Sequence, residues 1–189
     1  MSIDHLAIEK SVASFVTATV GSLLSKIPSK DGEKPSVVLA RQFSKDGKRR
    51  TPKIPDSPYC SVSYNKTIDD NGSELLAVED TNTEQTYRTH KLVSINVKFV
   101  GDRDNTVDDI ANRCHMFCEV ETYQDLLRTL SEQELELREK SDILPVNISL
   151  NDKYQEIRSF DLIFSVVDEV VIDLESVGYF DTITTSEVK

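Results

Sequence analysis

The sequence predicts an α+β protein whose sheet is covered on one side. Near the N-terminus, apolar residues recur at three- and four-residue steps, as in a helix that lies against a sheet. Between residues 87 and 100 the side chains alternate in character, as in a strand with one covered face. A second helical pattern and a final set of strands follow. The apolar face of the central strand comprises Val93, Ile95, Val97 and Phe99, against Ser94, Asn96 and Lys98 on the other face.

The first predicted helix runs from about Asp4 to Lys26. We expect Pro28 to end it, because a proline ring cannot continue the helical hydrogen-bond ladder. Its polar face has few basic residues, and Asp4 and Glu9 would repel anionic lipid. A helix packed on a sheet is therefore favoured over one lying on a membrane surface. The apolar stripe consists of Ile8, Val12, Phe15, Val16, Thr19, Val20, Leu23 and Ile27.

A polar loop is expected over residues 28–35, followed by a short strand at 37–43. The next strand covers residues 58–64, where Pro58 takes the first position, which tolerates proline. Residues 67–86 contain Asn71-Gly72 and are expected to form a long turn or protruding hairpin, with an apolar centre that carries a strand of its own.

After the central strand, a helix is predicted from Val107 to about Val120, with Thr106 as its N-cap. A second helix carries Leu126, Leu127 and Leu130. Alternation around Leu135 and Leu137 indicates a short exposed strand, and residues 142–149, which include Pro145, are expected to be irregular.

The last long strand is predicted over residues 154–171, with a bulge near Arg158 and Ser159 where the apolar phase shifts. A closing strand is expected at 178–183, and a frayed tail at 184–189. The length of 189 residues fits a single domain over 1–189, with loop insertions at about 44–57 and 67–86.

The chain is expected to be made and used in the cytoplasm. Three cysteines are an odd and sparse set, which suits a reducing compartment better than a disulfide framework. The N-terminus lacks the features of a signal peptide, and no apolar stretch approaches the roughly 20 residues that cross a bilayer.

The net charge of −11 disfavours binding along a nucleic-acid backbone. It still allows the chain to line a DNA conduit, because a channel through which DNA slides must be acidic or neutral to avoid retaining phosphates. The one strongly basic run, residues 45–53, leaves three alternatives open: a solvated loop, a docking site for an acidic partner, or a nucleic-acid contact. Its basic residues are Lys45, Lys48, Arg49, Arg50 and Lys53.

No catalytic residue, cofactor or metal site is predicted. Cys114 and Cys118 share one helix face, but no further Cys or His pair closes a zinc site around them and His115, so buried thiols are expected. A Cys–His hydrolase has no supporting motif. The acidic pairs Asp69-Asp70, Asp108-Asp109 and Asp168-Glu169 are expected to be solvated surface residues.

The order of several motifs resembles the phage neck or tail terminator family, also called tail completion proteins. The motifs are residues 38–42, the proline-tyrosine strand at 58–63, the long strand 87–100 and the two-part helix 106–131. They continue with the aromatic-x-Glu-x-Arg pattern of Tyr154, Glu156 and Arg158, and with residues 173–183. The resemblance covers about residues 36–185.

This resemblance implies a structural virion protein, not an enzyme, located at the neck or tail top and assembled in the host cytoplasm. Family members form a hexameric ring that caps the tail tube, and the sheath where present, and joins the head-side connector. DNA passes through without specific binding, and no membrane is involved. The implied fold is a mostly antiparallel sheet with the long N-terminal helix and the central helical pair packed on one face.

In such a ring the basic run would dock on tube, sheath or connector. The acidic stretch 67–86 would meet neighbouring subunits or face the channel, through Asp69, Asp70, Glu74, Glu79, Asp80 and Glu84. Two alternatives are a head-completion adaptor or stopper of the neck, and a small cytoplasmic enzyme that uses Cys114 or His115.

Overall fold

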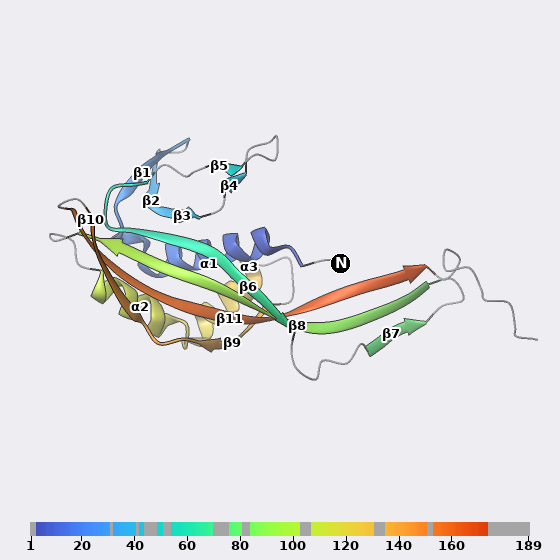
Figure 1. Cartoon of the computed structure of the whole chain (residues 1–189). Helices are drawn as coiled ribbons and strands as arrows, with labels where there is room; N and C mark the ends of the chain where they lie inside the picture. Colours follow the sequence, from blue (N-terminus) through green and yellow to red (C-terminus); the bar gives the residue numbers. More distant parts are fainter. Residues whose placement is uncertain are drawn as a thin grey trace, which may run out of the picture.

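The predicted α+β class is confirmed. A computed structural model describes residues 3–30, 32–40, 42–43, 49–50, 54–69, 76–80, 84–102, 107–130, 135–150 and 153–173. In this part of the chain, helix α1 (His5–Val20) and the pair α2 (Asp108–Phe117) and α3 (Glu121–Leu130) pack on a long, twisted sheet (Figure 1).

The main sheet has seven strands in the order β10-β11-β8-β6-β3, with β9 beside β11 and β7 beside β8. All pairs are antiparallel except β3 and β6, which are parallel, so the expected mostly antiparallel sheet is confirmed. The strands are β3 (Val37–Leu39), β6 (Tyr59–Asp69), β7 (Leu76–Asp80), β8 (Glu84–Gly101), β9 (Leu135–Lys140), β10 (Leu144–Leu150) and β11 (Lys153–Asp173).

The core lies between the three helices and one face of the sheet. The predicted stripe of α1 is buried over most of its length, and the alternating face of β8 is fully buried, as expected. Burial of such side chains is the main favourable term in folding. The fully buried residues from these elements and from β11 include Ile8, Val12, Phe15, Val16, Val93, Ile95, Val97, Phe99, Leu162 and Phe164.

Three strands extend beyond the helices as a ribbon, which we call the arm (Figure 1). It consists of β7, residues 84–90 of β8 and residues 167–173 of β11, with His90 opposite Val167 and Glu84 opposite Asp173. Seven residues in a strand span about 23 Å. The strand expected at the apolar centre of 67–86 is present as β7, which pairs with β8 in the arm. Asn71-Gly72 lies outside the described residues.

The prediction that α1 continues to Lys26 and stops at Pro28 is wrong. The helix ends at Val20, a single 3₁₀ turn covers Gly21–Leu23, and Pro28 lies in β1 (Lys26–Ser29). A Cβ on Gly21 would lie 2.9 Å from Pro35 Cγ, so the glycine allows β2 (Gly32–Pro35) to pass close to the helix end.

The expected polar loop at 28–35 is instead the β1–β2 hairpin, which turns at Gly32 with a φ of +112°. Hydrogen bonds hold the chain on either side of it: Ser25 Oγ donates to Asp56 O at 2.6 Å, and Ser36 N donates to Ser25 O at 2.9 Å. These contacts come from distant segments, which local periodicity does not reveal.

The segment 142–149, expected to be irregular, forms strand β10. It tolerates Pro145 because β10 is an edge strand, and its pairing with β11 is unbroken. The predicted bulge at Arg158 and Ser159 is absent, since the β8–β11 register is continuous. The alternation of apolar residues changes phase there because both faces of the strand are buried, with Ile157 on one face and Phe160 on the other.

Helix α2 begins one residue later than predicted, and its N-cap is Val107, which makes no side-chain capping bond. The proposed cap Thr106, the closing strand at 178–183 and the tail 184–189 lie outside the described residues. The remaining short strands are β4 (Gln42–Phe43) and β5 (Arg49–Arg50), which pair with each other.

Candidate interaction surfaces

The predicted docking residues fall in the segment around β5. Arg49 and Arg50 form β5, with Phe43 and Gln42 opposite them in β4. The other three candidates, Lys45, Lys48 and Lys53, lie outside the described residues. The role of this basic run stays a prediction.

The acidic candidates gather at the arm and its base. Asp69 ends β6, Glu79 and Asp80 end β7, and Glu84 begins β8. Asp70 and Glu74 lie outside the described residues. The backbone therefore brings four of the six positions to one end of the sheet, away from the helices (Figure 1).

The cysteines behave as the sequence predicts. Cys60, Cys114 and Cys118 are buried and free. Burial raises the pKa of the Cys114 thiol well above its usual range and that of Cys118 to about 12. A thiol that resists ionisation is a poor nucleophile and a poor metal ligand. Among the described residues, no group of three or more potential metal ligands occurs.

His115 is a structural residue. Its Nε2 lies 2.9 Å from Ser141 O, its Nδ1 lies 3.2 Å from Lys140 Nζ, and its ring stacks edge-on against Phe160. Lys140 Nζ also lies 2.8 Å from Glu119 Oε1. These contacts tie α2 to β9 and β11.

The Glu-x-Arg part of the family-like motif forms an ion cluster between β11 and the first turn of α2. Arg158 donates from Nε and Nη2 to the two carboxylate oxygens of Asp108, and Nη2 also lies 2.7 Å from Glu156 Oε1. The hydrogen bond from Arg158 lowers the pKa of Asp108. Asp108 is thus an ion-pair partner, contrary to the expectation of a merely solvated acidic pair.

Asp168 and Glu169 are also paired across the sheet. Asp168 Oδ2 lies 3.1 Å from Lys91 Nζ, and Glu169 Oε2 lies 3.9 Å from Arg88 Nε. The expectation for this pair is therefore wrong as well, because the antiparallel register brings basic residues of β8 beside it.

Glu9 departs most from its sequence interpretation. The sequence predicts it on the polar face of the first helix, yet it is only 4% exposed. Its Oε1 accepts a hydrogen bond of 2.5 Å from Tyr64 N, next to a register shift between Tyr64 and Lys66 in β6. Glu9 thus supplies a side-chain acceptor to the backbone of β6 where its ladder with β8 is irregular.

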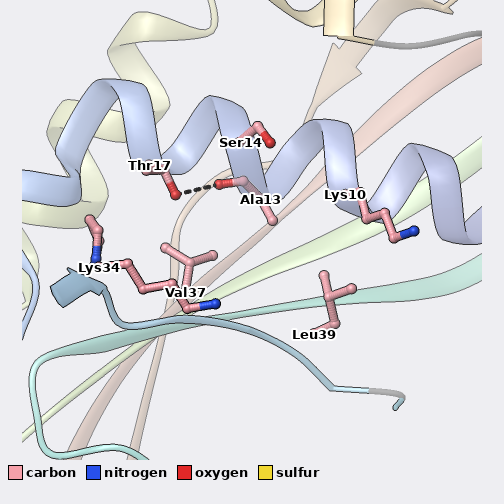
Figure 2. A pocket seen from close by; sticks show the side chains of 8 residues that line it. Lys10, Ala13, Ser14, Thr17, Lys34, Val37 and Leu39 are labelled. Atoms are coloured by element: carbon pink, nitrogen blue, oxygen red, sulfur yellow. Dashed lines mark hydrogen bonds between the residues drawn. The ribbon is translucent and has the colours of Figure 1, made fainter. Parts of the chain in front are cut away.

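A groove of about 350 Å³ lies between α1 and the strands β2 and β3 (Figure 2). We call it the α1–β3 groove. Lys34 enters at the Thr17 end, and Lys10 lies toward the opposite end. Thr17 Oγ1 is occupied by a 2.9 Å hydrogen bond to Ala13 O. The groove is also lined by Lys10, Ala13, Ser14, Lys34, Val37 and Leu39.

The comparisons with known proteins decide between the classes considered above. A family model described as phage neck terminator protein matches residues 7–188. The chain belongs to this family. The match includes α1, which precedes the segment where the sequence resemblance begins. A comparison with curated proteins gives no match.

Membership settles the broad role. The phage neck terminator proteins are structural proteins, so this chain is a virion component with a neck or tail-completion role and not an enzyme. The alternative of a small enzyme that uses Cys114 or His115 is therefore excluded. No helix of the described chain is long and apolar enough to cross a membrane.

Proposed function

We propose that identical copies of this neck terminator form a closed ring, hexameric as the resemblance implies, that caps the finished tail tube and joins it to the head-side connector. The observation that carries the proposal is the family match over residues 7–188, which spans the helices and the whole described sheet. In this proposal DNA passes through the ring without specific binding. The net charge of −11 supports this part, because a channel wall with an excess of acidic over basic residues does not retain phosphates.

Electron microscopy of the purified protein, alone and bound to tail tubes, tests the ring directly. The expected result is closed rings that sit at the head-proximal end of the tube. Particles in which the protein lies elsewhere would contradict the proposal. A pull-down that recovers the portal-side adaptor but no tail tube protein would favour a head-completion adaptor or stopper.

The basic run 45–53 is proposed to dock on tube, sheath or connector. Reversing Lys48, Arg49 and Arg50 to Glu is expected to reduce the yield of joined virions, since the charge of the docking surface changes sign. The thermal midpoint of the variant is expected to stay near that of the wild type. An unchanged virion yield would remove the docking role.

A further inference from the structure

The α1–β3 groove has the layout of a site for an added strand. Val37 and Leu39 line it from β3, which is the last strand of the main sheet, and Ala13 and Ser14 line it from α1. Among the described residues, no strand pairs with the outer edge of β3. An extended segment that enters such a groove gains backbone hydrogen bonds from the edge strand and side-chain contacts from the helix.

The backbone of β3 is oriented to pair with an added strand at its outer edge. Ser36 O accepts from Cys60 N, and Ala40 N donates to Val62 O, so the even-numbered positions face β6. Backbone groups alternate between the two sides of a strand. The N–H and C=O groups of Val37 and Leu39 therefore point to the outer edge, and their half-buried side chains line the groove.

The charge of the groove indicates what enters it. Lys10 and Lys34 are exposed, and neither forms a salt bridge with any described residue. Two basic side chains around an apolar floor, on a chain with a net charge of −11, favour an acidic segment with an apolar centre.

The arm has that chemistry. Strand β7 reads Leu-Ala-Val-Glu-Asp, and Arg88 is the single Lys or Arg of the arm as defined. Its acidic residues are Glu79, Asp80, Glu84, Asp168, Glu169 and Asp173. Like β3, β7 is an edge strand of the described sheet. None of the arm residues with a described exposure is buried. Two- or three-stranded ribbons of this kind are marginally stable alone.

We propose that the acidic arm of one copy docks in the α1–β3 groove of the next, with β7 added beside β3. This inference rests on the proposed assembly of identical copies and names the surfaces that meet. The arm and the groove are different surfaces, so the contact is head-to-tail, and such contacts form rings when the rotation closes.

Disulfide trapping between full-length chains tests the contact. One chain carries Ser14→Cys in the groove, and the other carries Ala77→Cys or Glu79→Cys in β7. The native cysteines are buried and do not compete. We expect mild oxidation to give a cross-linked heterodimer with at least one β7 variant. The matched control replaces Ser14→Cys by Lys66→Cys, an exposed β6 residue that does not line the groove, and should give none.

Trapping that fails with both β7 variants would overturn the inference, as would equal trapping with the Lys66→Cys control. Closed rings seen by electron microscopy in the absence of trapping would leave the ring proposal standing and reject only this contact. Trapping in the absence of closed rings would support this contact and reject the closed ring.

A charge swap gives an independent readout by sedimentation velocity at matched concentration. The pair Lys10→Glu and Lys34→Glu is expected to weaken self-association at least tenfold, and Glu79→Lys with Asp80→Lys to do the same. A variant with all four changes should recover most of the lost self-association. The proposal would be contradicted if the Lys10→Glu, Lys34→Glu variant associated as strongly as the wild type. It would also be contradicted if the variant with all four changes associated no better than either double variant.

Discussion

The helix-covered body and the arm are built from the same two strands but differ in what stabilises them. In the body, β8 and β11 bury Val97, Phe99 and Leu162 completely under the helices. Beyond that layer the same strands continue into the arm, where Arg88 is exposed and Val171 is 53% exposed. The β8–β11 pairing thus continues without a break over 18 residue pairs, although the helices cover only part of its length. The difference teaches that the body is stabilised by its own core, whereas in the proposed contact the arm is stabilised by the neighbouring copy.

The largest expected effect is in the body. Phe99→Ala should destabilise the chain by about 3–5 kcal/mol, because it leaves a cavity beside Phe160 in a fully buried layer. Val171→Ala in the arm is the control and should change the free energy of unfolding by less than about 0.5 kcal/mol. Urea denaturation measures both. Equal effects at the two sites would break the distinction between body and arm.

A smaller effect is expected where α1 meets the irregularity of β6. Glu9→Ala removes the carboxylate that accepts from Tyr64 N and should cost about 1–3 kcal/mol, because a part-buried hydrogen bond to a charged group is lost. Glu9→Gln keeps an acceptor oxygen and should recover part of the loss. If Ala and Gln were equally tolerated in denaturation curves, the hydrogen bond would have no structural role.

The smallest effect concerns the ion cluster that joins β11 to α2. Asp108→Asn should cost about 1 kcal/mol or less at neutral pH, because Asp108 is half exposed and solvent screens the pair. The pKa of Asp108 is lowered in the folded state, so its contribution is present above the ordinary value of 3.8 and is lost as the pH falls through the lowered value. The difference between wild type and variant should therefore shrink below about pH 4. A difference that grows on acidification would contradict this assignment.

Sequence periodicity was sufficient to predict which faces of α1 and β8 are buried in the body. The α1 stripe and the alternating face of β8 predicted their own burial, because each pattern reports one covered side. It failed where a distant segment decides the outcome: Gly21 ends α1 against Pro35, and Glu9 is buried because a β6 irregularity lies opposite it. Pro145 misled the strand prediction because edge position depends on the whole sheet.

The interaction surfaces were predicted only in part. The acidic content of 67–86 and the strand at its apolar centre could be seen in the sequence, since charge and apolar runs are local signals. The α1–β3 groove could not be predicted, because Lys10 of α1 and Lys34 of β2 line one groove only in the folded chain. The Arg158 cluster was visible as a motif, but its partner Asp108 required the fold.

Hydrogen–deuterium exchange of the dilute chain and of the assembled ring measures the division between body and arm most directly. In the dilute chain, amides of the arm should exchange far faster than those of β8 and β11 under the helices, and assembly should protect the arm selectively. An arm that is protected as strongly as the body before assembly, or whose exchange does not change on assembly, would contradict the account.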